Sequence, residues 1–168
     1  VQFGAWNGFV YVTPLLGGYI ADTHLGRYKT ILIFSLIYLA GLTLFIFGSI
    51  PGGVTAAVVF GGMYIIAMGA GGIKPNVSTM GADQFDPHDE QDKKESAQFF
   101  SYFYWSINLG ALIAYSLVAY ICQYGLPFLG GEPWGFFVGY TIPLVMMCVG
   151  IFVFVSGSSR YKKMKPKG

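Results

Sequence analysis

The sequence contains the stretch Met68-Gly69-Ala70-Gly71-Gly72-Ile73-Lys74-Pro75-Asn76-Val77-Ser78, which ends a long apolar run that begins near Ala56. A lysine is out of place there, because an ammonium at the centre of a bilayer costs about 2.5–3.5 kcal/mol even on the lenient insertion scale. Pro75 removes a backbone donor and predicts a kink or a loosened turn. The glycines before Lys74 predict that another helix approaches this one closely.

Lys74 has two interpretations. Its ammonium faces either a water-filled cavity or a counter-charge, which makes it a functional candidate, or it snorkels to the membrane surface. The next carboxylate, Asp83, follows nine residues later, about 13 Å further along a helix. A lysine side chain does not cover that distance, so we favour the cavity-facing lysine.

The composition predicts an all-α polytopic membrane protein. The chain is 54% hydrophobic and 11% charged, whereas soluble domains carry about 25% charged residues. The apolar runs are long and continuous rather than alternating, which is typical of transmembrane helices and not of a transmembrane barrel.

Five apolar segments predict five spans. They cover residues 1–21, 30–50, 56–80, 99–121 and 134–155. A polar loop joins the third span to the fourth, and Ser96 is the predicted cap of the fourth helix. In the first span, Gly4 and Gly8 form a small-xxx-small pair, which predicts close contact with another helix.

The basic residues predict the orientation. Nine of the ten Lys and Arg residues fall on one side of the five alternating spans, and the tenth is Lys74. By the positive-inside rule that side is cytoplasmic, including the basic tail, residues 158–168. An odd number of spans that begins outside implies one span before Val1, and no signal peptide is visible. We therefore expect a fragment of a longer chain.

Three further side chains put polar groups inside apolar spans. Tyr11 is too central for an interfacial anchor, so its hydroxyl faces either a cavity or a neighbouring helix. Tyr104 and Asn108 are four residues apart and share one helix face. An aromatic belt with an interhelical amide is the alternative for that face.

The short turn after the first span is charged. Arg27 can bind a carboxylate through two parallel hydrogen bonds. Asp22 lies five residues before it, and Lys29 lies two residues after it. A solvated loop that merely obeys the positive-inside rule is the alternative.

Several classes of chemistry are not expected. No nucleophile, base and orienting group stand together, so the chain is not predicted to be an enzyme. We expect no metal site, no cofactor and no nucleic-acid partner. Cys122 and Cys148 fall at different depths of their predicted spans, which argues against a disulfide.

Two groups of motifs resemble known families. Gly18-x-x-x-Asp22-x-x-x-Gly26-Arg27-x-Lys29 resembles the loop between helices two and three of the major facilitator superfamily. Two further motifs resemble the signatures of the proton-dependent oligopeptide transporter family. The first is Gly72-Ile73-Lys74-Pro75-Asn76-Val77-Ser78-x-x-Gly81-Ala82-Asp83-Gln84-Phe85. The second is Phe99-Phe100-x-x-Phe103-Tyr104-x-x-Ile107-Asn108-x-Gly110. The resemblance covers nearly the whole chain, as helices two to six. It implies a partial N-terminal six-helix half of a twelve-helix fold.

The resemblance also implies roles. Lys74 resembles the family's lysine that joins proton coupling to the peptide site. The family's cavity residues that contact bound peptide are matched here by Tyr11, Tyr104 and Asn108. The family's inner gate, which breaks and forms as the two halves rock, is matched here by Asp22, Arg27 and Lys29. The family's first-helix Glu-x-x-Glu-Arg motif has no match, and its charges would be the partners of Lys74.

The implied function is proton-coupled symport of di- and tripeptides by alternating access. The expected partners are small peptides, protons as the coupling ion, the lipid bilayer, and the first helix and C-terminal half of the same chain. The expected location is the plasma membrane or an endosomal, lysosomal or vacuolar membrane. The alternatives are a peptide/histidine or nitrate carrier of the same family, and a membrane sensor or adaptor that binds peptide without transporting it.

Overall fold

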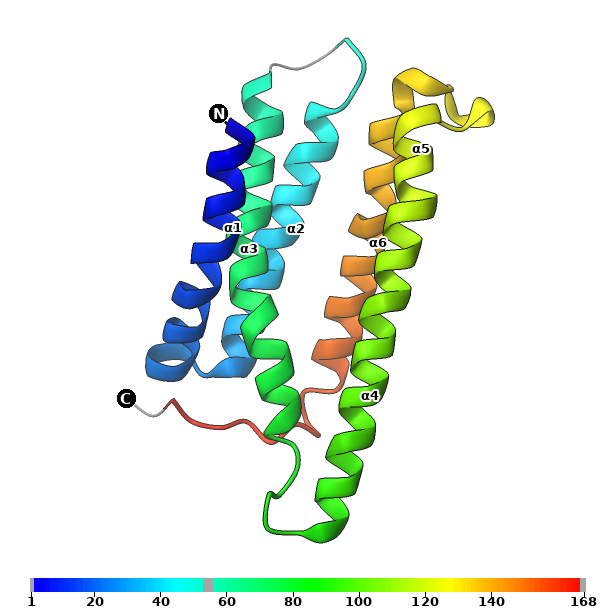
Figure 1. Ribbon diagram of the computed structural model, residues 1–168. Coiled ribbons are helices and arrows are strands. Elements are labelled where there is room, and N and C mark those ends of the chain that lie inside the picture. The colour runs from blue at the N-terminus through cyan, green and yellow to red at the C-terminus, as the bar shows by residue number, and fades with distance from the viewer. Residues whose placement is uncertain (1, 53–55, 167–168) are drawn as a thin grey trace.

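The computed structural model describes residues 2–52 and 56–166, and long helices run side by side through it (Figure 1). The long helices are α1 (Gln2–Ile20), α2 (Arg27–Gly48), α3 (Ala56–Ala82), α4 (Glu90–Ile113) and α6 (Gly135–Ser156). Each overlaps one predicted span. Val1 and residues 167–168, which belong to the predicted first span and tail, lie outside the described residues.

Short elements connect these helices. A π-turn, η1 (Ala21–Leu25), leads into α2. A second π-turn, η2 (Ala114–Val118), joins α4 to α5 (Ala119–Tyr124), so that one continuous helix runs over Glu90–Tyr124. Two 3₁₀ turns, η3 (Pro127–Leu129) and η4 (Glu132–Trp134), precede α6.

Among the described residues, four helical segments are long and apolar enough to cross a membrane. They are Arg27–Gly48, Ala56–Ala82, Glu90–Tyr124 and Glu132–Ser156. The helix α1 lies beside them but contains Gln2 and Asn7, which lower its apolar character. Its crossing of the membrane stays a prediction.

The helices pack in two groups. The helix α3 packs between α2 and α1, while α6 packs against α2 and α5. Figure 1 shows α4 on the far side of α6 from α1, and α4 has no buried residue. The buried apolar side chains come mainly from α2 and α3: Ile31, Leu42, Phe45, Ile46, Ala67 and Met80, with Ala21 and Ile121 from the connecting elements.

Glycines allow α1 and α3 to approach each other closely at Gly17 and Gly71. A Cβ on Gly17 would lie 2.4 Å from the carbonyl oxygen of Gly71. The predicted close approach beside Lys74 is therefore confirmed on the α3 side. The close contact predicted for Gly4 and Gly8 stays a prediction, because no described heavy atom lies within 4 Å of a Cβ at either position. The two helices also meet through hydrogen bonds, since Trp6 Nε1 donates to the carbonyl of Met63 at 3.1 Å and Thr13 donates to the carbonyl of Ala67 at 3.1 Å.

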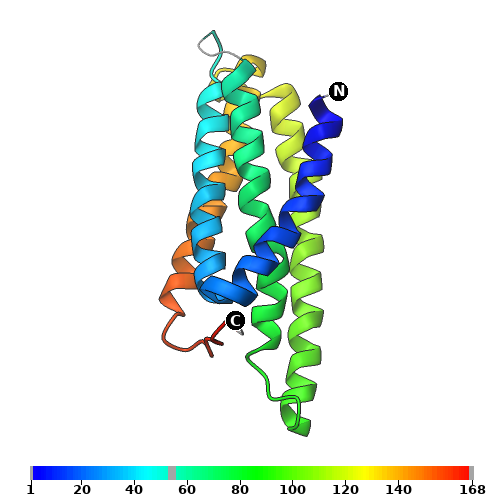
Figure 2. The same ribbon diagram turned by 90° about the vertical axis from the view of Figure 1, so that its left-hand side faces the viewer.

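The fourth long helix begins earlier than predicted, at Glu90 rather than near residue 99. Its cap is not Ser96 but Asp89, whose carboxylate accepts the backbone N–H of Gln91 at 2.8 Å. Glu90 and Asp92 in the first turn also stabilise this helix start, because their negative charges lie at the positive end of the helix dipole. Hydropathy marks where a helix enters apolar surroundings, whereas this helix starts in a polar stretch that extends beyond the other helices (Figure 2).

The connections that were predicted to share one side do so. The turn η1, the segment after α3 and the residues after α6 all lie at one end of the bundle, opposite the N-terminus (Figure 1). We call this end the inner end.

Candidate functional site

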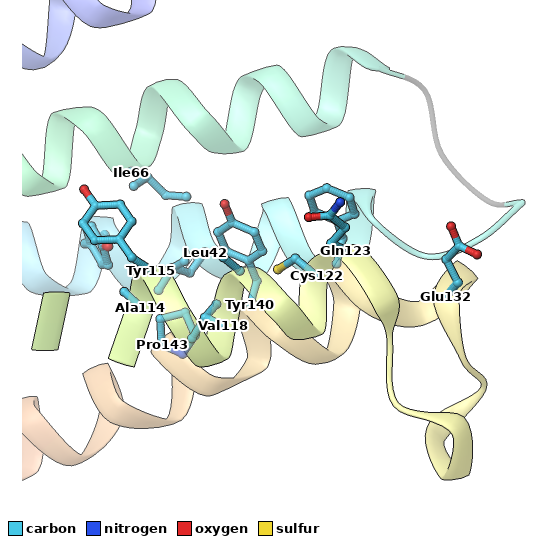
Figure 3. A pocket seen from close by; sticks show the side chains of 13 residues that line it. Leu42, Ile66, Ala114, Tyr115, Val118, Cys122, Gln123, Glu132, Tyr140 and Pro143 are labelled. Atoms are coloured by element: carbon cyan, nitrogen blue, oxygen red, sulfur yellow. The ribbon is translucent and has the colours of Figure 1, made fainter. Parts of the chain in front are cut away.

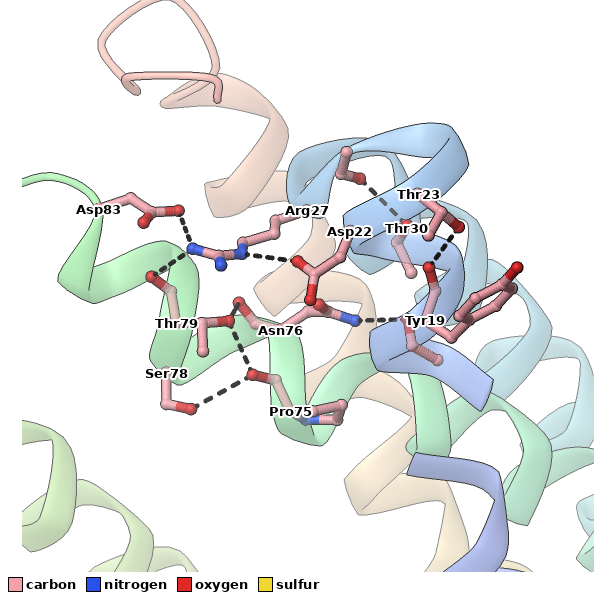
Figure 4. A network of polar contacts seen from close by, with 12 residues as sticks. Tyr19, Asp22, Thr23, Arg27, Thr30, Pro75, Asn76, Ser78, Thr79 and Asp83 are labelled. Carbon is pink, nitrogen blue, oxygen red and sulfur yellow. Dashed lines mark hydrogen bonds and ion pairs between the residues drawn. The ribbon is translucent and has the colours of Figure 1, made fainter. Parts of the chain in front are cut away.

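Arg27 joins two acidic side chains at the inner end (Figure 4). Its Nε lies 3.5 Å from Oδ1 of Asp22, and its Nη1 donates to Oδ2 of Asp83. The side chains of Arg27 and Asp83 are 25% and 19% exposed, whereas that of Asp22 is 60% exposed. Attraction between charges is stronger where water is partly excluded, so the pair with Asp83 dominates what we call the Arg27 cluster (Asp22, Arg27 and Asp83).

The fold brings this cluster together from two chain segments. Gly26 adopts a φ of +76°, which ends η1 and lets α2 begin at Arg27. The hydroxyl of Thr30 donates to the Gly26 carbonyl at 3.0 Å and fixes this first turn. Asp83 directly follows the last residue of α3. Since α2 and α3 are antiparallel neighbours, the start of one lies beside the end of the other.

Sequence reasoning selected Asp22, Arg27 and Lys29 but assigned no role to Asp83. The signal was available, because Arg27 begins one helix and Asp83 ends the next at the same predicted side of the membrane. Lys29 is exposed and takes part in no ion pair among the described residues. Its membership of a gate stays a prediction.

A buried amide lies beside this cluster. Asn76 is 2% exposed, and its Nδ2 donates to the carbonyls of Gly17 at 3.1 Å and Gly72 at 2.8 Å. The helix α3 continues through Pro75, whose carbonyl accepts the Thr79 hydroxyl at 2.8 Å. These contacts join α1 to α3 close to Lys74.

Lys74 is exposed, and it lines a cavity of about 400 Å³ between α3, α2 and α6. The other lining residues are mostly apolar: Tyr38, Ala70, Ile73, Pro143, Met146 and Met147. Within residues 2–52 and 56–166, no carboxylate forms an ion pair with Lys74. The geometry therefore leaves its ammonium available for a counter-charge, and its role in proton coupling stays a prediction.

A larger cavity of about 850 Å³ adjoins this one, and both have Tyr38 and Pro143 in their walls. It lies between α2 and α3 on one side and η2, α5 and α6 on the other (Figure 3). Leu42, Ile66 and Val118 contribute apolar surface. Its polar lining groups are the side chains of Tyr38, Tyr115, Gln123, Glu132 and Tyr140.

The other predicted site residues lie on outer surfaces of the described bundle. Tyr11 is 78% exposed and Tyr104 is 66% exposed. Asn108 donates to the carbonyl of Tyr104 at 2.8 Å, which confirms that these two share a helix face. None of the three lines either cavity described above. The structure therefore does not bring them to Lys74, and their contact with substrate stays a prediction.

Solved structures share this fold. A POT family transporter, PepTSo, superposes with a TM-score of 0.82 at 35% identity, over 99% of this chain and 30% of that one. The peptide transporter POT (E310Q mutant) in complex with alafosfalin matches with a TM-score of 0.72 at 30% identity, over 93% of this chain and 28% of that one. The fold is therefore that of the N-terminal part of a major facilitator superfamily membrane transporter, which confirms the predicted fold class.

The family follows from the sequence comparisons. The profile of the POT family matches residues 28–168, and the chain belongs to this family. It is 41% identical to Protein NRT1/PTR FAMILY 8.1 of Arabidopsis thaliana over 97% of this chain. It is 39% identical to Solute carrier family 15 member 2 of Danio rerio over 99% of this chain. The chain spans 30% and 23% of the lengths of these two relatives.

Proposed function

We propose that the whole protein is a proton-coupled symporter of di- and tripeptides. The observation that carries the proposal is Lys74, an exposed cation that lines a mainly apolar cavity of a POT-family chain, without an acidic partner among the described residues. An intramembrane cation of this kind is a functional group by default. The relative in complex with alafosfalin supports a peptide-like substrate.

The mechanism follows from the charge of Lys74. A carboxylate from the rest of the protein, on the helix that resembles the family's first helix, pairs with Lys74. Protonation of that carboxylate releases Lys74, which then contacts the substrate. Release lets the two halves of the transporter rock, and the Arg27 cluster with Lys29 acts as the inner gate. Tyr11, Tyr104 and Asn108 contact the peptide once the halves of the cavity are together.

The protein is an integral membrane protein, since its family and the four long apolar helices among the described residues require a bilayer. We propose the plasma membrane or an endosomal, lysosomal or vacuolar membrane as its location.

A second candidate is transport of another solute, such as nitrate or histidine. The observation that favours it is the name of the relatives at 41% identity, which belong to the NRT1/PTR group. A third reading, a sensor or adaptor, differs from both in that it binds peptide without flux.

The test uses full-length protein in proteoliposomes. Uptake of a labelled dipeptide is followed with and without an inward proton gradient. Accumulation that needs the gradient, and that tripeptides but not single amino acids inhibit, supports the symporter. Binding without accumulation supports the sensor, and neither binding nor uptake directs the assay to nitrate and histidine.

A further inference from the structure

The residues that follow α6 turn back across the inner end of the bundle rather than leaving it (Figure 1). We call residues 158–166 the post-α6 segment. The side-chain amide of Gln84 holds its backbone: Nε2 donates to the carbonyl of Lys162 at 3.3 Å, and the Lys162 N–H donates to Oε1 at 2.9 Å. One side chain thus satisfies both backbone groups of Lys162, as a neighbouring β-strand would.

Aromatic rings form a second attachment. Tyr28, in the first turn of α2, stacks on Phe154 of α6 with ring centroids 5.0 Å apart and an interplanar angle of 18°. Tyr161 lies 5.5 Å from Phe154 and 6.3 Å from Tyr28. The ammonium of Lys163 sits 4.4 Å from the centroid of the Tyr28 ring, within cation–π range. The Tyr161 ring and the Lys163 ammonium therefore both attach the segment to Tyr28 at the start of α2.

The segment then passes over the Arg27 cluster. Met164, Lys165 and Pro166 line a small cavity of about 60 Å³, and its other walls come from the Arg27 cluster with Ala21 and Gly26. A Cβ on Gly26 would lie 3.2 Å from the carbonyl oxygen of Met164. Glycine at this position therefore serves the approach of the segment as well as the turn before α2.

The attachment is of a kind that opens easily. Every residue of the post-α6 segment is at least partly exposed, and the Gln84 hydrogen bonds are exposed as well. Segments with few buried apolar contacts and solvent-exposed hydrogen bonds open locally at low free energy. The segment is thus attached specifically but weakly.

We propose that the post-α6 segment is a reversible intramolecular cover for the Arg27 cluster, docked through Gln84 and Tyr28. When docked, it excludes water from one side of the Arg27–Asp83 pair, which strengthens the attraction between the two charges. When released, it exposes the pair to water and weakens it. The description of this pair as a gate rests on the proposed function, but the docking itself does not.

Limited trypsin digestion of the full-length protein in detergent tests the docking. Trypsin can cut after Arg160, Lys162 and Lys163, but not after Lys165, which precedes a proline. Cleavage requires the segment to leave its site. Substitution of Gln84→Ala removes both hydrogen bonds and is expected to raise the cleavage rate here about five- to tenfold.

Gln98→Ala is the matched control, because Gln98 is an exposed glutamine on α4 whose side chain makes no hydrogen bond to the segment among the described residues. It is expected to leave cleavage unchanged. Equal cleavage of Gln84→Ala and the unaltered protein overturns the proposal, as does equal acceleration in both variants. If Gln84→Ala fails to fold, Lys163→Gln replaces it, because this variant removes the cation that lies over the Tyr28 ring. Faster cleavage after Arg160 and Lys162 is then the expected result.

Thiol labelling tests whether the segment covers the cluster. Ala21 is 1% exposed and lines the small cavity, so a water-soluble maleimide is expected to label Ala21→Cys slowly, in a variant whose other cysteines are serine. Adding Gln84→Ala is expected to accelerate this labelling severalfold. His24→Cys, at an exposed position of the same turn, is the control and is expected to label rapidly in both backgrounds.

An Ala21→Cys labelling rate that does not change with Gln84→Ala overturns the covering role. Neither readout depends on uptake. Failure of this proposal and failure of the transport proposal are therefore distinguishable.

Discussion

Asn76 of α3 donates a hydrogen bond to the backbone carbonyl of Gly17 in α1, with an Nδ2–O distance of 3.1 Å, from a position that is 2% exposed. This contact joins the two helices beside the charged cluster. Asn76→Ala is expected to lower the free energy of unfolding by about 1 kcal/mol, because a buried hydrogen bond between helices is lost. Unfolding of the full-length protein in an SDS titration measures this. Asn108→Ala, which loses only an exposed contact within its own helix, should leave the free energy of unfolding nearly unchanged.

Gly17 and Gly18 form a matched pair of neighbouring glycines. A Cβ at Gly17 would lie 2.4 Å from the Gly71 carbonyl oxygen, whereas no described heavy atom is within 4 Å of one at Gly18. Gly17→Ala is therefore expected to destabilise the protein by about 1–3 kcal/mol. Gly18→Ala should be neutral or stabilise α1 by up to about 1 kcal/mol. The same SDS titration compares them, and similar effects at both positions would contradict the α1–α3 packing.

Lys74→Ala is expected to abolish uptake driven by a proton gradient while some counterflow of labelled dipeptide is retained. The reason is that the cation needed for coupling is lost while the cavity remains. The proteoliposome assay with and without a gradient separates these two activities. Lys94→Ala, a lysine exposed at the inner end of α4, is the control. Full proton-driven uptake by Lys74→Ala would rule out the coupling role.

Asp83→Asn should weaken the Arg27 cluster, because it leaves Arg27 with the more exposed Asp22 as its acidic partner among the described residues. A cost of about 1–2 kcal/mol is expected, between the values for exposed and buried ion pairs. Under the proposed function, uptake should also fall. The exchange of charges in Arg27→Asp with Asp83→Arg should restore part of the stability lost in either single variant. A double variant as unstable as the sum of the two single ones would show that the residues are not coupled.

Some of the candidate site was visible in the sequence and some was not. Lys74 stood out because a charge inside an apolar run is costly wherever that run folds. Asp22 and Arg27 stood out through their spacing in a known motif. The pairing of Asp83 with Arg27 was missed: the sequence placed both residues on the same side of the membrane, but they lie 56 residues apart and the packing of α2 on α3 makes them neighbours. Gln84 was missed for the same reason, because its partner Lys162 lies 78 residues away.

By itself, the sequence determined that this is a helical membrane protein, which segments form its apolar helices and which side of the bundle is basic. These properties depend on hydropathy and charge along the chain, so no knowledge of distant contacts is needed. Tertiary structure alone decided which glycines touch another helix, that Asp83 pairs with Arg27, and that the post-α6 segment docks on Gln84 and Tyr28. These features depend on which surfaces meet in space, and local composition does not encode that.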